Sequence, residues 1–271
     1  MFNKKENIYV IRVFGEISAT DKKVSNVKFK EIIDALHEVE TDDRAAGVIM
    51  HMNTPGGTTG ASEEIATMIQ KIRNKGIPVV ASIADMCCSG GFWIATACDK
   101  IFANKTSLTG SIGVIMMHMD FSSLAEKFGV KQTTIKAGKM KDIGSPFRKM
   151  TEEERQYFED AAKEVHAIFK SEVLIHRKAA MDAAKNKTLT IDEIFDGRPF
   201  SAVTALDNGL IDEIGTYHDA LQYLLNEIGE TEDDVEILEI SSKKSVVEII
   251  QGFMSNAITN AFSAICETKF N

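Results

Sequence analysis

The sequence has few cysteines and no long apolar run, and both shortages narrow the class of protein. None of its four cysteines forms a spaced pair of the kind that binds a metal, and adjacent Cys87 and Cys88 are poor disulfide partners for each other. We interpret the cysteines as small buried apolar residues in a reducing compartment and expect no metal and no cofactor. No window reaches the roughly 18 uninterrupted apolar residues of a transmembrane helix. The four are Cys87, Cys88, Cys98 and Cys266.

The sequence also has fewer positively than negatively charged residues. The chain has 31 Lys and Arg residues against 40 Asp and Glu, a net charge of −9, which argues against affinity for nucleic acid or an anionic membrane. The first seven residues lack the apolar core of a signal peptide. If Met1 is the natural start, we expect a cytoplasmic protein. If a preceding segment has been removed, we expect a membrane anchor.

The first 150 residues alternate between strand-like and helix-like segments. Apolar and β-branched runs predict strands at 8–14, 46–52, 77–84, 100–103 and 111–118. Amphipathic spacing predicts helices at 27–40, 62–75 and 90–97. Strands and helices that alternate at this spacing predict an α/β fold with a largely parallel core sheet.

After residue 150 the sequence becomes more helical. Thr151, with Glu154 at the capping-box position, predicts the start of a charged helix that runs to about Lys185. A helix-turn-helix element is expected at 190–208 and a short strand at 209–215. We therefore assign one domain to residues 1–240 and an amphipathic helix to 241–271. Its broad apolar face would pack on its own core or on a second subunit, with a membrane surface as the alternative.

Ser89 lies between two cysteines and two glycines, just after the third predicted strand. A hydroxyl at such a strand-to-helix turn is typical of a nucleophile, because the next backbone N–H can point at a developing oxyanion. A helix N-cap serine is the alternative. A second glycine turn, Gly56-Gly57, also follows a predicted strand. Since ligands of parallel α/β folds gather beyond the carboxyl ends of the strands, the two turns together favour an active site.

A serine hydroxyl needs a base before it can attack a carbonyl at neutral pH. Among six histidines, only His51 and His118 lie on predicted strands, and neither has a flanking glycine or loop that would present it to a serine. Lysine is the other candidate. The glycine-punctuated loop at 136–146 carries three of them, and its residues alone do not choose among Lys136, Lys139 and Lys141.

Six segments, in this order, resemble the signal peptide peptidase A family. Members of that family are serine peptidases with a Ser-Lys dyad and a ClpP/crotonase-like fold. The resemblance runs from about residue 8 to residue 228. The segments are NTPGG at 53–57, CCSGGFWIA at 87–95, DKIFAN at 99–104, SLTGSIGVI at 107–115, KAGKMKDIGSPFR at 136–148 and DGRPFSAVTALDNGLIDEIG at 196–215.

The resemblance assigns a role to each candidate site residue. It implies that Ser89 is the nucleophile and that Lys141 is the general base. Ser111 matches the serine that hydrogen-bonds the lysine amine and orients it. Gly57 and Gly90 match the backbone N–H donors of the oxyanion hole. The fold that it implies is α/β, a ClpP/crotonase-like core with a parallel sheet and surrounding helices, plus the C-terminal helical extension.

The same resemblance implies an endopeptidase that cleaves short apolar peptides, such as signal-peptide remnants, through an acyl-enzyme. The chain corresponds to the short, single-unit form, in which the lysine of one subunit is supplied to the serine of its neighbour around a homo-oligomeric ring. Cys87 and Cys88 depart from the small residues usual before the nucleophile, and a redox role for them stays open. Alternatives are a ClpP-like peptidase with a histidine base and a non-catalytic peptide-binding ring. No residue favours coenzyme A, so a crotonase-type acyl-CoA enzyme is not expected.

Overall fold

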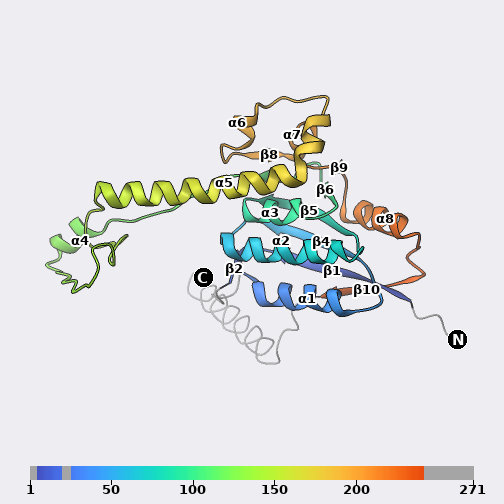
Figure 1. Cartoon of the computed structure of the whole chain (residues 1–271), viewed down its shortest axis with the longest axis horizontal. Coiled ribbons are helices and arrows are strands. Elements are labelled where there is room, and N and C mark those ends of the chain that lie inside the picture. The colour runs from blue at the N-terminus through green and yellow to red at the C-terminus, as the bar shows by residue number, and fades with distance from the viewer. Residues whose placement is uncertain (1–4, 20–25, 241–271) are drawn as a thin grey trace, which may run out of the picture. The chain divides into compact units, whose positions relative to one another are not determined.

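The computed structural model describes residues 5–19 and 26–240 and has a largely parallel sheet at its centre (Figure 1). Its strands follow the order β10-β1-β4-β5-β6-β9, and β1, β4, β5, β6 and β9 pair in parallel. The expected fold class is confirmed. The strands are β1 (Glu6–Phe14), β4 (Ala45–Thr54), β5 (Val79–Cys88), β6 (Lys100–Ala103), β9 (Glu213–Ile214) and β10 (Val235–Ile240).

Four short strands surround the end of β5 and the first glycine turn. β7 (Leu108–Gly110) pairs in parallel with the last residues of β5 and antiparallel with β8 (Pro199–Ser201). β2 (Glu16–Ser18) pairs with β3 (Asn26–Lys28), and a further bridge joins Ile17 to Gly57. These pairings bring segments from four parts of the chain to the carboxyl end of β5.

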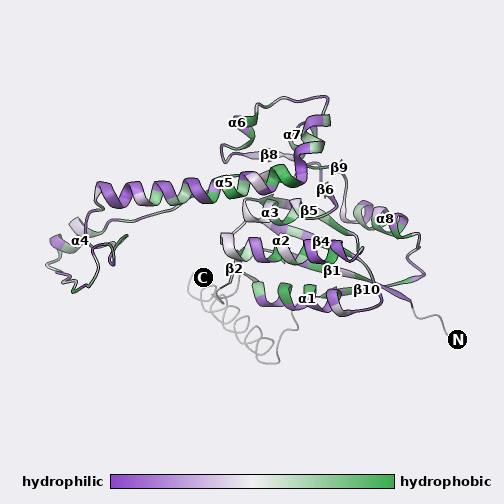
Figure 2. Ribbon diagram, in the orientation of Figure 1, coloured by the Kyte–Doolittle hydropathy of each residue, from purple (hydrophilic) through white to green (hydrophobic). Residues whose placement is uncertain are grey.

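Helices cover both faces of the sheet. Alternate residues of a strand point to opposite faces, and Ile8, Val10, Ile49 and Val80 form one buried face on which α8 (Tyr217–Ile228) packs. On the other side α1 (Phe29–Thr41), α2 (Thr59–Asn74) and α3 (Gly90–Thr96) pack next to one another. Polar and apolar residues alternate along α1, as expected for a helix with one buried face (Figure 2).

The long helix α5 (Glu152–Ala183) is buried against this core along its C-terminal half. Phe169, Val173, Arg177 and Met181 are spaced by four residues and are buried, so they form one stripe along the helix. The Phe169 ring stacks on Trp93 of α3 with centroids 4.9 Å apart. In the N-terminal half only Glu154 is buried. The predicted capping box of Thr151 and Glu154 is confirmed.

Three further helices are short: α4 (Ser122–Lys127), α6 (Ile191–Ile194) and α7 (Ala202–Asp207). The expected strand at 111–118 is wrong. The strand lies earlier, at β7, and the positive φ angles of Gly110 and Ser111 turn the chain out of the sheet. The sequence analysis also missed α8 and β10, and β8 interrupts the expected helix-turn-helix. The helix expected at 241–271 lies outside the described residues. Among the helices described, none is long and apolar enough to cross a membrane.

Candidate active site

Ser89 follows the last residue of β5 and stands at the N-cap position of α3. Its backbone has φ 51° and ψ −124°, a conformation that L-residues rarely adopt and that costs free energy unless the surroundings impose it. Its N–H donates to the Gly110 carbonyl at 2.8 Å, and its carbonyl accepts from the Trp93 N–H at 3.0 Å. The hydroxyl makes no capping hydrogen bond. The N-cap alternative therefore gives no reason for a hydroxyl at this strained position.

The two glycine turns meet beside this serine. A Cβ atom on Gly56 would lie 2.8 Å from both the Cys88 carbonyl oxygen and the Ser89 Cβ, and 2.9 Å from the Gly90 nitrogen. A Cβ atom on Gly57 would lie only 1.8 Å from the Ile17 carbonyl oxygen. Because no side chain fits at either position, the backbone itself forms the wall next to Ser89.

The N–H groups of Gly57 and Gly90 are the candidate oxyanion donors. A Cβ atom on Gly90 would lie 3.4 Å from the Gly57 nitrogen, so the two amides are neighbours. The hydrogen bonds among the described residues give neither N–H an acceptor. Two free, adjacent N–H groups next to a hydroxyl can stabilise the negative charge of a tetrahedral intermediate.

Ser111 lies beside Ser89 through the pairing of β7 with β5, in which Gly110 stands opposite Cys88. It also has a positive φ, 52°. Its N–H donates to the Arg198 carbonyl at 3.1 Å, and its Oγ–H donates to the Gly197 carbonyl at 3.0 Å. A hydroxyl has one proton, so the Ser111 oxygen is left as an acceptor. It can receive an N–H from an amine placed between the two serines.

Lys141 lies in the loop before α5, and its exposed side chain has no hydrogen bond or ion pair within the described residues. The loop is tied to the first turn of α5 by Arg148, which binds both Asp142 and Glu154. Fifteen positions separate Glu154 from Phe169, which packs against α3. At 1.5 Å per residue this is about 22 Å of helix. The single chain thus brings Ser89, Ser111, Gly57 and Gly90 together but leaves Lys141 at the far end of α5.

Neither candidate histidine base reaches Ser89 in the described chain. His51 lies three residues before Thr54, which stands opposite Cys87, two residues before Ser89, so about five residues of strand, roughly 16 Å at about 3.3 Å per residue, separate His51 from Ser89. Its ring packs between Phe14 and Tyr217. His118 lines a cavity of about 620 Å³ together with residues around Ile143 of the Lys141 loop.

The cysteines before the nucleophile are buried. Burial raises the pKa of the Cys88 thiol to about 11, and it holds the pKa of Cys87 well above its ordinary value. The Cys87 sulfur lies 3.8 Å from the Met52 sulfur. Since the thiolate is the reactive form, these cysteines are poorly suited to redox chemistry at neutral pH.

Sequence reasoning missed three groups that fix Ser111 and its neighbour. Two are the backbone carbonyls of Gly197 and Arg198 described above. The third is His166 of α5, whose Nε2 lies 3.1 Å from the Ile112 carbonyl oxygen. The DGRP sequence at 196–199 was the available signal, because its glycine has φ 92° and exposes the carbonyl.

The parallel α/β core, the strained serine and the paired glycine turns form the arrangement expected of a serine peptidase. Residues 71–229 match the family described as Peptidase family S49. The chain belongs to this family, and the family resemblance found in the sequence is confirmed. The match supports the expected class of enzyme, a serine peptidase.

Two curated relatives agree with this assignment. A protein of Methanocaldococcus jannaschii named as a putative protease is 41% identical over 192 residues, which cover 71% of this chain and 59% of the relative. The "Putative signal peptide peptidase SppA" of Enterococcus faecium is 35% identical over 231 residues, or 83% of this chain and 64% of the relative. The chain thus spans about three fifths of the length of these two proteins.

A solved structure supports the fold. A variant of the 1510-N membrane-bound stomatin-specific protease superposes with a TM-score of 0.55. The two sequences are 14% identical, and the match covers 89% of this chain and all of the other. At this identity the likeness concerns the fold alone.

Proposed function

We propose that this chain is a serine endopeptidase in which Ser89 attacks the peptide bond and Lys141 of a neighbouring copy is the general base. The observation that carries the proposal is the arrangement at the end of β5. An uncapped serine hydroxyl at a strained φ stands next to the free N–H groups of Gly57 and Gly90 and next to Ser111. A purely structural serine would not require any of these features.

We propose that Ser111 orients the amine of Lys141 towards Ser89. Its proton is donated to Gly197, so its oxygen accepts an N–H of the neutral lysine amine. The amine lone pair is then directed at the Ser89 hydroxyl. When Ser89 Oγ bonds to the substrate carbonyl carbon, its proton passes to the lysine, and the carbonyl oxygen becomes an oxyanion between Gly57 and Gly90.

The lysine then donates this proton to the leaving amine, and the C–N bond breaks to give an acyl-enzyme on Ser89. In the second half, water attacks the acyl carbon while the lysine again accepts a proton. Breakdown of the second oxyanion breaks the bond between Ser89 Oγ and the acyl carbon and releases the carboxyl product, while the lysine returns its proton to Ser89 Oγ. No metal or cofactor enters this sequence of steps.

The distribution of exposed apolar side chains supports a base that comes from another copy. Ile115, Met117 and Ile135 are 81%, 89% and 96% exposed, and they lie in the segment that surrounds Lys141. Further exposed apolar residues, among them Met116, Met119 and Phe128, belong to the same segment. Such a surface is typical of an interface. We propose that it packs on a neighbouring copy and delivers Lys141 to that copy's Ser89, so that the assembly closes into a ring.

The proposed substrates are short, extended, apolar peptides. The signal peptide peptidase name of the Enterococcus faecium relative supports signal-peptide remnants as the natural class. The backbone wall formed by Gly56 and Gly57 carries no side chain next to Ser89, which supports a site that accepts an extended substrate backbone.

Kinetics of single variants test the proposal. We expect Ser89→Ala and Lys141→Ala to abolish cleavage of an apolar reporter peptide, and a serine-reactive probe to label only Ser89. Lys139→Ala is the matched control, since Lys139 is an exposed lysine of the same loop that pairs with Glu153. Full activity in Lys141→Ala would refute the dyad. Loss in His51→Ala or His118→Ala alone, without loss in Lys141→Ala, would favour a histidine base.

A further inference from the structure

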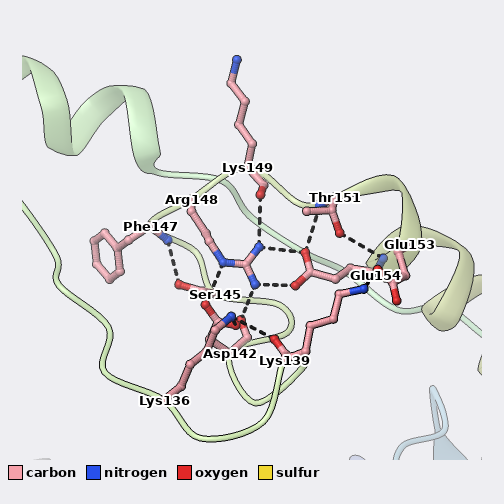
Figure 3. A network of polar contacts seen from close by, with 10 residues as sticks. All are labelled: Lys136, Lys139, Asp142, Ser145, Phe147, Arg148, Lys149, Thr151, Glu153 and Glu154. Atoms are coloured by element: carbon pink, nitrogen blue, oxygen red, sulfur yellow. Dashed lines mark hydrogen bonds and ion pairs between the residues drawn. The ribbon is translucent and has the colours of Figure 1, made fainter.

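Arg148 uses all five of its N–H donors to fasten the Lys141 loop (Figure 3). Nε donates to the Asp142 carboxylate at 2.9 Å, and Nη2 to the Asp142 backbone carbonyl at 2.9 Å. Nη1 donates to the Lys149 carbonyl at 3.2 Å and to Glu154 at 2.8 Å, and Nη2 also binds Glu154. One guanidinium therefore holds the residue next to Lys141, the end of the loop and the first turn of α5.

The partners of Arg148 are themselves held in place. Glu154 is buried and closes the capping box, because its carboxylate accepts from the Thr151 N–H at 2.9 Å while its own N–H donates to Thr151 Oγ1. Lys136 binds the Asp142 carboxylate and donates to the Lys139 carbonyl. The loop is thus fixed to a helix end that is already rigid.

The same network sets the charge of the carboxyl groups near the proposed base, Lys141. Hydrogen bonds from Arg148 and then from Lys136 hold the pKa of Asp142 well below its ordinary range, and hydrogen bonds from Arg148 lower the pKa of Glu154 to about 2. Both groups are carboxylates at any working pH. A carboxylate next to Lys141 favours the protonated ammonium, which cannot accept a proton. Arg148 and Lys136 supply two positive charges against these two negative ones.

The remaining charged groups around the loop are also balanced. Lys139 is paired with Glu153 of α5. From the segment before α4, Asp120 interacts electrostatically with both Lys149 and His118. Removal of Arg148 would therefore leave one uncompensated carboxylate next to the base.

We propose that Arg148 is a positioning residue for the peptidase reaction: it fixes the Lys141 loop to α5 and neutralises the carboxylate beside the base. The inference rests on the proposed role of Lys141. The five acceptors around this position require the five N–H donors of a planar guanidinium. A lysine has only three donors and could not bind all five acceptors.

Steady-state kinetics across pH separate the two effects. We expect Arg148→Ala to lower kcat by about 100-fold, the usual consequence of a catalytic group misplaced by about 1 Å. KM should change little, because the N–H donors of Arg148 are all used within its own chain. The acidic limb of the kcat profile should move to higher pH, since one uncompensated carboxylate beside Lys141 favours the ammonium.

Two further variants isolate charge from geometry. Arg148→Lys keeps the charge, so the acidic limb should stay in place while kcat falls. The double variant Arg148→Ala with Asp142→Asn restores the charge balance, so the limb should return while kcat stays low. If Arg148→Ala does not assemble, Arg148→Lys still separates the two effects, because it keeps the positive charge and loses the planar fork.

Arg155→Ala is the matched control. Arg155 also binds two glutamates, Glu152 and Glu159, at the same end of α5, but it does not contact the Lys141 loop through these bonds. We expect wild-type kcat and pH dependence. Wild-type kcat and pH limb in Arg148→Ala, with Lys141→Ala inactive, would overturn the inference and leave the proposed function intact. An active Lys141→Ala would instead overturn the proposed function.

Discussion

Two inactive variants should restore each other's activity when they assemble together. Ser89→Ala retains a working Lys141, and Lys141→Ala retains a working Ser89. About 22 Å of helix lies between the point where α5 packs near Ser89 and the turn that holds the Lys141 loop. A lysine side chain is far too short to cross this distance within one chain. In the proposed ring of heterologous contacts, each serine would meet the lysine of the next copy.

The activity expected of mixed assemblies follows from the fraction of active sites that contain both an intact serine and an intact lysine. With equal amounts and random assembly, half of the serines are intact and half of the neighbouring lysines are intact, so about one quarter of the sites should be complete. The two chains can be co-expressed with different tags and purified through both. Activity per site with an apolar reporter peptide, together with titration by a serine-reactive probe, gives the fraction.

The control assembly pairs Ser89→Ala with the double variant that lacks both Ser89 and Lys141. It contains no intact serine and should be inactive. Mixed assemblies of the two single variants that form with native mass but show no cleavage would refute a base supplied between copies.

Three further changes test the site and its supports. Gly57→Ala places a Cβ 1.8 Å from the Ile17 carbonyl oxygen, so the turn must move, and kcat should fall by about 100-fold or more in a protein whose circular dichroism is unchanged. The folded pKa of Glu154, about 2, is depressed from 4.5, so its contribution to stability is present above pH 4.5 and is lost as pH falls towards 2. Denaturant titrations of Glu154→Gln should lose this pH dependence; an unchanged dependence would contradict the network. Cys88 has a buried thiol of pKa about 11, so activity should survive iodoacetamide at pH 7 and in Cys88→Ala, and inactivation would point to a role for the thiol.

Much of the fold could be predicted because its signals are local. Continuous apolar runs marked the parallel strands, and glycine turns marked the ends of β4 and β5 where Ser89 lies. The strand expected at 111–118 failed for a physical reason. Its apolar residues, such as Ile115 and Met117, are exposed in the single chain, and the turn at Gly110 and Ser111 ends the strand before them.

The residues of the candidate site that belong to short sequence motifs could be predicted. The backbone carbonyl that holds Ser111 could not, because it comes from a distant part of the chain. Ser89, Gly57, Gly90 and Ser111 belong to short motifs, and the structure brings them together. The carbonyl that fixes Ser111 comes from Gly197, 86 residues later in the chain. A carbonyl has no residue type that would reveal it in a sequence. The role of Lys141 stays a prediction.

The N-terminal half of α5 sets the distance between the Lys141 loop and the point where the helix packs on α3. One end of this segment is bound to the Lys141 loop through Glu154, and the other is stacked on Trp93 through Phe169. One inserted residue would lengthen it by about 1.5 Å and rotate its two ends against each other by about 100°. The reach and the direction of the proposed base would both change, although no reacting atom had been touched. In the proposed dyad, the number of residues between Glu154 and Phe169 therefore matters for catalysis as much as their identity.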